Sequence, residues 1–189
     1  SVARKRMSFI FLFLMAYPGG ATAFQHEPAE LAVTIKGRAH RLEALIVKPD
    51  GAGPFPLAVI SHGSPRKAED RAKAIPNGLS RQAEEFAAHG YLTAVVMRRN
   101  YGRSSGEWAE SYDGCKFGAY EQGGNGSADD IAAAIGVLSA RPDVDAATIV
   151  AIGQSAGGFG SLAYAARNPK GLKAVINFAG GRGSQGKWD

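Results

Sequence analysis

The stretch "IVAIGQSAGGFGSLAYAARN", residues 149–168, decides the fold. It begins as an apolar strand, turns at "GQSAG" and continues as an alanine-rich segment of helical character. The turn fits the pattern Gly-x-Ser-x-Gly, which exposes a serine hydroxyl at the carboxyl end of a sheet when a strand precedes it and a helix follows. The two glycines keep side chains away where strand and helix come close. The spacing therefore predicts that Ser155 is a nucleophile.

A nucleotide-binding turn is the alternative interpretation of this glycine-rich stretch. Such a turn needs the pattern Gly-x-Gly-x-x-Gly directly after the first parallel strand. The sequence "GQSAGG", residues 153–158, does not match that pattern.

An oxyanion hole is predicted from two backbone N–H groups. The N–H of Ala156 lies at the start of the predicted helix, where the helix dipole favours a developing negative charge. A second donor is expected from the loop that follows an earlier strand, which ends in "SHGS", residues 61–64. The N–H of Ser64 is the candidate because Gly63 lets the chain turn tightly there. Taken alone, "SHGS" also fits an ordinary turn at the end of a strand.

Strand and helix patterns alternate along most of the chain. Residues 31–36 and 41–49 are predicted to form an antiparallel hairpin. Further strands are then expected over residues 55–63, 91–97, 147–153 and 172–181, with helices between them. This order predicts an α/β fold, a three-layer sandwich with a mostly parallel sheet. No repeat or linker is evident, so residues 24–189 are expected to form one domain.

Two segments before the serine turn carry further predictions. Residues 98–126 are expected to form a long loop whose aromatic residues either wall an apolar pocket or pack on the surface: Tyr101, Trp108, Tyr112, Phe117 and Tyr120. Ser127 is predicted to cap the next helix, and Asp129 and Asp130 to form its solvated first turn.

The first residues have the features of a secretory signal peptide. Arg4, Lys5 and Arg6 precede an apolar run over residues 7–17, and "ATA" follows at residues 21–23. The run is short for a membrane span, although an uncleaved N-terminal anchor is the alternative. The sequence thus predicts a signal peptide over residues 1–23, export to the periplasm or the extracellular space, and no stable membrane span after cleavage.

Net charge and cysteine content limit which binding partners, disulfides and metal sites the sequence predicts. Removal of residues 1–23 takes away three positive charges and no negative ones, which lowers the net charge from +5 to +2. That balance gives no electrostatic case for nucleic-acid binding. The single cysteine, Cys115, excludes an internal disulfide and is interpreted as a buried or loop thiol. No Cys/His spacing indicates a metal site, and we expect no cofactor.

These segments resemble the α/β-hydrolase family, especially its dienelactone-hydrolase-like and prolyl-oligopeptidase-like branches. The resemblance is carried by "VISHGS" (residues 59–64), "RRNYGRSSG" (98–106), "AIGQSAGG" (151–158) and "LKAVINFAGG" (172–181), and covers about residues 41–181. It implies that Ser155 acts with an Asp or Glu and a His, in that chain order. Dienelactone hydrolases themselves carry a Cys nucleophile. Serine at position 155 therefore moves the expected substrate toward ordinary esters or peptides.

The base that such a serine needs is not evident, because all four histidines precede Ser155: His26, His40, His62 and His89. We favour the interpretation that the sequence is the first part of a longer chain, with Met7 as the start and the acid and His beyond Asp189. The 189 residues alone should then be inactive and weakly stable, since a shortened parallel sheet leaves an apolar edge.

A base within the sequence and a protein without catalysis are the two alternatives. His62 could act as the base, because its strand neighbours that of Ser155 in the resembling fold, but no third group to orient it is evident. The protein could instead be a non-catalytic binding module on a hydrolase fold. Asp189 is a poor candidate for the acid because a terminal residue anchors a buried hydrogen bond badly.

The function expected from these features is an exported serine hydrolase that cleaves carboxylic esters through an acyl-enzyme on Ser155. A peptidase of the prolyl-oligopeptidase-like type is the alternative within the same class. The expected substrate is accordingly a small-molecule ester or a short peptide.

Overall fold

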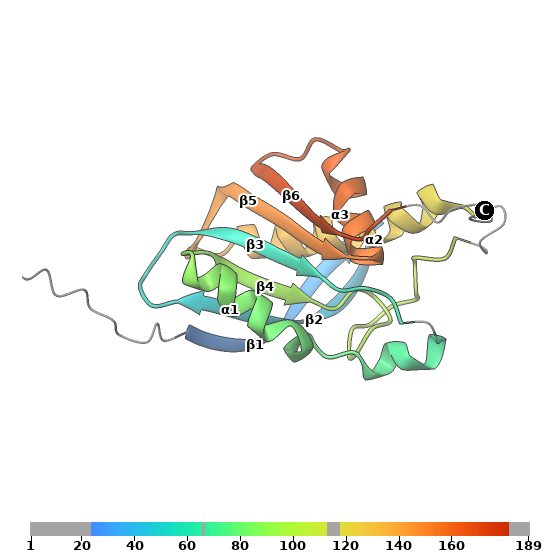
Figure 1. The fold of residues 1–189 in the computed structure, drawn as a ribbon, viewed down its shortest axis with the longest axis horizontal. Helices are drawn as coiled ribbons and strands as arrows, with labels where there is room; N and C mark the ends of the chain where they lie inside the picture. Colours follow the sequence, from blue (N-terminus) through green and yellow to red (C-terminus); the bar gives the residue numbers. More distant parts are fainter. Residues whose placement is uncertain (1–23, 66, 113–117, 182–189) are drawn as a thin grey trace, which may run out of the picture.

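One mixed sheet organises the molecule. The computed structural model describes residues 24–65, 67–112 and 118–181, so the predicted signal peptide, Cys115, Phe117 and Asp189 lie outside the described residues. Within them the strands follow the order β1-β2-β4-β3-β5-β6 (Figure 1). Their bounds are β1 Phe24–Ile35, β2 Arg38–Pro49, β3 Phe55–Ser61, β4 Leu92–Val96, β5 Val144–Gln154 and β6 Leu172–Phe178.

The pairing of these strands confirms the predicted mostly parallel sheet. β1 and β2 form the expected antiparallel hairpin, and β2 also runs antiparallel to β4. The other neighbours, β4 with β3, β3 with β5 and β5 with β6, are parallel. The carboxyl ends of β3 and β5 therefore meet at one edge of the sheet, with Ser61 in register with Gly153.

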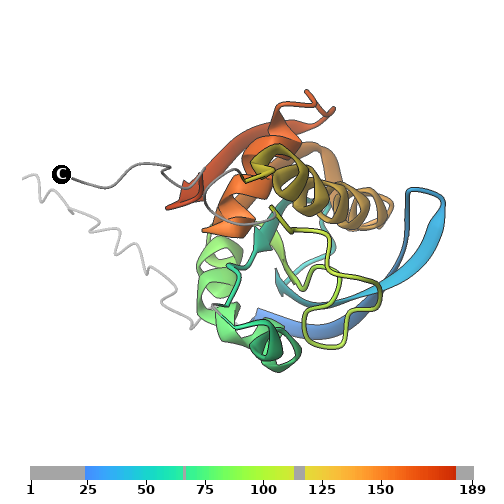
Figure 2. The ribbon, with the colours of Figure 1, turned by 90° about the vertical axis from the view of Figure 1, so that its right-hand side faces the viewer.

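Helices cover both faces of the sheet, which confirms the three-layer arrangement. α1 (Ser80–Ala88) packs on one face, and α2 (Tyr120–Ser139) and α3 (Ala156–Ala165) pack on the other (Figure 2). Two short 3₁₀ helices, η1 (Ala68–Lys73) and η2 (Pro76–Leu79), lie between β3 and α1. No helix among the described residues is long and apolar enough to cross a membrane.

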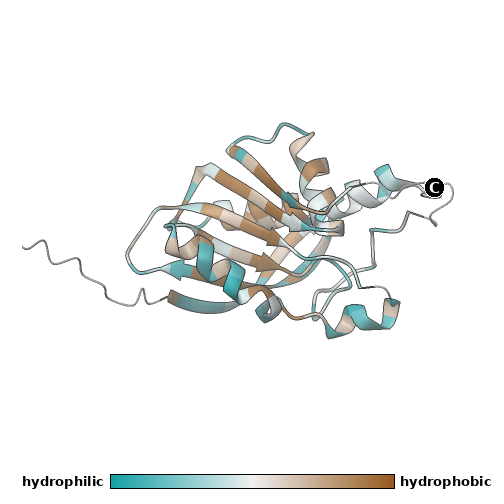
Figure 3. Ribbon diagram, viewed as in Figure 1, coloured by the Kyte–Doolittle hydropathy of each residue, from teal (hydrophilic) through white to brown (hydrophobic). Residues whose placement is uncertain are grey.

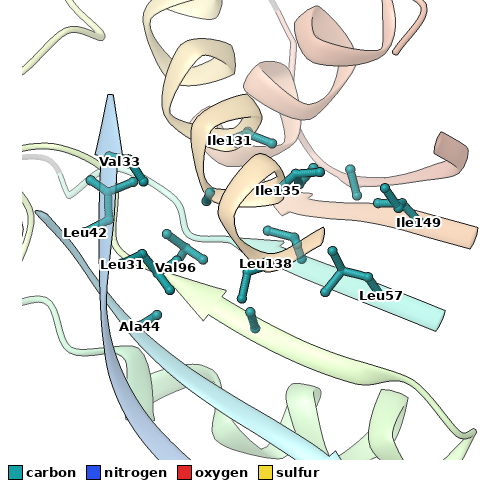
Figure 4. Close-up of a cluster of buried hydrophobic side chains, with 14 of the residues drawn as sticks. Leu31, Val33, Leu42, Ala44, Leu57, Val96, Ile131, Ile135, Leu138 and Ile149 are labelled. Carbon is teal, nitrogen blue, oxygen red and sulfur yellow. The ribbon is translucent and has the colours of Figure 1, made fainter. Parts of the chain in front are cut away.

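The core is divided between these two faces because neighbouring residues of a strand point in opposite directions. In β3, Leu57 and Val59 belong to the core under α2 and α3, whereas Ala58 and Ile60 belong to the core under α1. Figure 3 shows the hydrophobic residues concentrated on the central strands. Figure 4 shows the larger core, where α2 meets the sheet through Ile131, Ile135 and Leu138. Full burial of a large aliphatic side chain contributes roughly 1.5–3 kcal/mol.

The start of α2 differs from the prediction. The helix begins at Tyr120 rather than at a cap on Ser127, so the preceding loop ends at Ala119. Three glycines gave this part of the sequence the character of a loop: Gly123, Gly124 and Gly126. These helical positions require glycine because residues packed against α2 leave no room for a side chain. A Cβ on Gly126, for example, would lie 1.9 Å from the carbonyl oxygen of Ala109.

The expectation of a solvated first turn at Asp129 and Asp130 was also wrong. Asp130 is only 1% exposed, and its carboxylate accepts hydrogen bonds from the backbone N–H and the Nε of Arg99, at 2.8 and 2.6 Å. Burial raises the pKa of Asp130, while these bonds from Arg99 oppose the rise. Asp129 forms ion pairs with Lys36 and Arg167, at 3.0 and 2.9 Å. Both carboxylates thus tie α2 to its neighbours.

Candidate active site

Ser155 occupies a strained turn between β5 and α3. Its backbone has φ 51° and ψ −120°, a conformation that residues other than glycine rarely adopt. Two hydrogen bonds hold the turn: the N–H of Ser155 donates to the carbonyl of Phe178 at 2.8 Å, and the N–H of Phe159 donates to the carbonyl of Ser155 at 2.9 Å. Ser155 is exposed, as a nucleophile must be.

The glycines on either side of Ser155 are required by close backbone contacts. A Cβ on Gly153 would lie 2.2 Å from the carbonyl oxygen of Gly157. A Cβ on Gly157 would lie 2.3 Å from the carbonyl oxygen of Ser61 on the neighbouring strand β3. These glycines thus allow α3 to start directly against the ends of β3 and β5.

Replacement of Gly157 by alanine is therefore expected to destabilise the protein by about 1–3 kcal/mol and to displace the serine turn. The matched control is Gly136→Ala, because Gly136 is exposed on α2 and a Cβ there meets nothing within 4 Å. Alanine at that helical position is expected to stabilise by about 0.5–1 kcal/mol. Urea unfolding measures both free energies, and equal values for the two variants would contradict this account of the turn.

The structure brings the predicted nucleophile and the two residues of the predicted oxyanion hole to one cavity. Ser64, Ser155 and Ala156 line one cavity of about 690 Å³. The loop after β3 lies directly against the serine turn, since a Cβ on Gly63 would be 3.4 Å from the Cβ of Ser155. The N–H of Ala156 lies at the first position of α3, as the sequence predicted. That the N–H groups of Ala156 and Ser64 bind an oxyanion beside Ser155 stays a prediction.

Aromatic side chains form much of the cavity wall. Trp108 and Tyr112 come from the long loop, Tyr120 from the start of α2 and Phe159 from α3. The rings of Tyr112 and Tyr120 are stacked, with centroids 5.3 Å apart. The interpretation of these loop aromatics as a pocket wall is thus confirmed for three of them.

A buried ion pair forms part of this wall, because Glu110 also lines the cavity. Arg98 follows β4 and Glu110 belongs to the long loop, and their side chains are 1% and 5% exposed. The Nε of Arg98 contacts one carboxylate oxygen, and its Nη2 donates to the other at 3.1 Å. Its Nη1 donates to Ser61 Oγ at 2.8 Å and to the carbonyl of His62 at 2.7 Å. The pair therefore joins the long loop to the ends of β3 and β4.

Glu110 also contacts Ser64, in the loop after β3 that carries the second predicted oxyanion donor. Its Oε2 accepts hydrogen bonds from the hydroxyls of Ser64 and Tyr101, each at 3.0 Å. Burial alone would raise the pKa of Glu110, but the guanidinium of Arg98 outweighs it and holds the pKa below its usual value. The carboxylate stays charged and fixes the side chain of Ser64.

The geometry agrees with the similarity of the chain to known proteins. The sequence model of the X-Pro dipeptidyl-peptidase (S15) family matches residues 36–188, which is most of the chain. The chain belongs to this S15 family. No curated protein matches it significantly.

Solved structures of hydrolases share the fold. A CIB-like hydrolase from Thermoplasma acidophilum aligns over 82% of the chain and 64% of its own, with a TM-score of 0.54 and 15% identity. Acetyl xylan esterase 1 from Thermoanaerobacterium aligns over 84% and 54%, with a TM-score of 0.53 and 21% identity. Dipeptidyl peptidase 4 from Porphyromonas gingivalis aligns over 82% and 21%, with a TM-score of 0.54 and 25% identity. The S15-family chain thus spans less than two thirds of each of these proteins.

His62 is held as a structural residue in this S15-family chain. Its Nδ1–H donates to the carbonyl of Gly63 at 2.8 Å, so its Nε2 carries no proton and accepts the backbone N–H of Arg98 at 3.1 Å. Burial, together with the guanidinium of Arg98, lowers the pKa of His62 to about 3. Because both ring nitrogens are bound, we do not assign the base to His62.

The remaining three histidines lie away from the serine. His26 contacts Glu84 at 2.9 Å, and His89, at the end of α1, donates to the carbonyl of Glu85 at 2.8 Å. His26, His40 and His89 line neither of the cavities that Ser155 lines in the described part of the S15-family chain. The identity of the base stays a prediction.

Metal ligands do not gather in the described part of the chain. Within residues 24–65, 67–112 and 118–181, no group of three or more His, Cys, Asp or Glu side chains is close enough to hold an ion.

Proposed function

We propose that the protein is a serine hydrolase that cleaves carboxylic esters through an acyl-enzyme on Ser155. The observation that carries this proposal is the placement of Ser155 in a strained, exposed turn, on a cavity wall that it shares with Ser64 and Ala156. Membership of the S15 family and the fold shared with esterases and peptidases support the same chemistry.

The reaction would proceed in two steps. Ser155 Oγ attacks the ester carbonyl carbon and its proton passes to a general base, while the N–H groups of Ala156 and Ser64 bind the oxyanion. The carbon–oxygen bond to the alcohol then breaks, and the alcohol leaves with the proton from the base. Water repeats the sequence on the acyl-enzyme and releases the acid and free Ser155.

A dipeptidyl peptidase is the second candidate. The activity for which the family is named, X-Pro dipeptidyl-peptidase, favours it, as does the 25% identity to the P. gingivalis dipeptidyl peptidase 4. The same acyl-enzyme chemistry would then release an amine in place of an alcohol.

Labelling with a fluorophosphonate tests the nucleophile in the full-length protein. We expect one covalent adduct, which peptide mapping places on Ser155 and which is absent from Ser155→Ala. Equal labelling of the variant would refute the assignment, and no labelling of either protein would favour a non-catalytic binding module. Rates with 4-nitrophenyl acetate and glycyl-prolyl-4-nitroanilide then separate the esterase from the dipeptidyl peptidase.

We also propose that the protein is exported to the periplasm or the extracellular space. Support comes from the basic residues 4–6, the apolar run over residues 7–17 and the small residues that end at Ala23. The expected mature protein begins at Phe24. N-terminal sequencing of the protein from cell fractions tests this, and recovery of a protein that retains residues 7–23 in the cytoplasm would contradict export.

A further inference from the structure

The cavity wall beside Ser155 carries a cation without an ion-pair partner among the described residues. Arg71, on η1, lines this cavity. Its Nε donates to Asn100 Oδ1 at 3.3 Å. Neither Nη1 nor Nη2 has an acceptor within the described part of the chain. The two terminal nitrogens, which form the fork that binds planar anions, are therefore available to a ligand.

The guanidinium of Arg71 packs against the ring of Trp108. Its Cζ lies 4.3 Å from the centroid of the Trp108 ring, a cation–π arrangement. The Nε1–H of Trp108 donates to the Tyr101 hydroxyl at 3.1 Å, and the carbonyl of Arg71 accepts the N–H of Gly102 at 3.0 Å. A side chain that is already ordered loses less entropy when it binds a ligand.

The other charged residue on the wall cannot serve a cationic ligand. Glu110 is the one carboxylate among the described lining residues, and both of its oxygens are bound. Arg98 neutralises its charge, while the hydroxyls of Ser64 and Tyr101 donate to its Oε2. The uncompensated charge of the described wall is thus the positive charge of Arg71.

We propose that Arg71 binds a carboxylate of the substrate, so that the preferred substrate is an ester with a carboxylate away from the scissile bond. The proposal rests on the proposed function, and it names the substrate class of the same site. The aromatic walls accept the apolar part between the two groups. A substrate with a free amino terminus, as a dipeptidyl peptidase uses, finds no available carboxylate on this part of the wall.

Two matched substrate pairs test the proposal in the full-length protein. The first is monoethyl glutarate with ethyl pentanoate, which places the carboxylate in the acyl part. The second is 4-acetoxybenzoate with its methyl ester, which places it in the alcohol part. For at least one pair we expect kcat/KM to favour the anion by about tenfold or more at low salt. In Arg71→Gln the ratio of kcat/KM for the anion to kcat/KM for the neutral ester should fall to about one.

Arg81→Gln is the control, because Arg81 is an exposed cation on α1 that does not line the cavity. It should keep the preference of the parent. Equal rates for anion and neutral ester in both pairs, or a preference that survives Arg71→Gln, would overturn the proposal. Faster turnover of glycyl-prolyl-4-nitroanilide than of every ester, unaffected by Arg71→Gln, would overturn it as well.

A binding measurement separates this proposal from the proposed function. Trp108 contacts Arg71, so its fluorescence, in a background in which Trp188 and any other tryptophan are replaced by phenylalanine, reports glutarate binding without any turnover. We expect the Kd for glutarate to rise about tenfold or more in Arg71→Gln. Glutarate binding that depends on Arg71, in a protein that no fluorophosphonate labels, would uphold the anion site and reject the hydrolase. Labelling of Ser155, together with the same glutarate Kd in the parent and in Arg71→Gln, would uphold the hydrolase and reject the anion site.

Discussion

Replacement of Ser155 by alanine is expected to lower kcat for ester hydrolysis by roughly 10⁴–10⁶-fold in the full-length protein. Without Oγ no acyl-enzyme forms, and the N–H groups of Ala156 and Ser64 can only assist attack by water. KM should change little, because the small side chain of Ser155 contributes little to binding before the reaction starts. Steady-state kinetics with the preferred ester measures the effect.

Ser161→Ala is the matched control for this variant. Ser161 lies on the same helix, is fully buried, and its hydroxyl donates within the helix to the carbonyl of Gly157 at 2.9 Å. It should retain kcat within a few-fold of the parent. Retention of kcat by Ser155→Ala, or its collapse in both variants at unchanged stability, would reject Ser155 as the nucleophile.

Replacement of Arg98 by methionine is expected to destabilise the protein by about 3–5 kcal/mol, the largest effect on stability that we predict. The variant leaves the carboxylate of Glu110 buried without its counter-charge, and leaves Ser61 and the carbonyl of His62 without a donor. Urea unfolding measures the loss. The double variant Arg98→Met/Glu110→Gln should recover most of it, because it removes both buried charges.

Arg103→Met provides the exposed counterpart. Arg103 pairs with Glu43 at 3.0 Å, but its side chain is 83% exposed, so its loss should cost about 1 kcal/mol or less. Similar losses for Arg98→Met and Arg103→Met would contradict the role given to the buried pair.

The buried pair also predicts how stability depends on pH. The pKa of Glu110 is lower in the folded protein than its usual value, so folding favours the charged carboxylate. Its contribution is complete above the pKa of the unfolded chain, about 4.3, and is lost as the pH falls through the lower folded value. The stability difference between the parent and the double variant should therefore change below about pH 4 and stay constant above about pH 5.

The serine turn could be predicted from sequence because its determinants are local. A strand, two glycines and a helix within about twenty residues suffice to place Ser155 and Ala156, and the alternation of elements places Ser64 on the neighbouring strand end. The extra residues of β1, 24–30, before the predicted start at residue 31, pair with residues 43–49 of β2. These residues were not predicted to be a strand because many of them are polar. Polar residues occur there because this part of the hairpin is partly exposed to solvent.

The polar network behind the site could not be predicted in the same way. An arginine directly after an apolar strand signals a buried cation that needs a partner. The sequence offers several carboxylates in the following loop and helix, and only the folded chain selects Glu110 of the loop for Arg98 and Asp130 of α2 for Arg99. The start of α2 could not be predicted for the same reason. Its glycines look like loop residues in the sequence, and only the fold shows that close contacts with Ala109 and Phe159 leave no room for a side chain there.

The backbone at Ser155 also restricts the chemical identity of the nucleophile. A residue branched at Cβ clashes with its own backbone at the positive φ of 51° found here, whereas an unbranched side chain tolerates it. Threonine carries the same hydroxyl but is excluded by this geometry. Of the residues that attack carbonyl groups through a short side chain, serine and cysteine remain, so the turn limits the evolution of this site to an exchange of oxygen for sulfur.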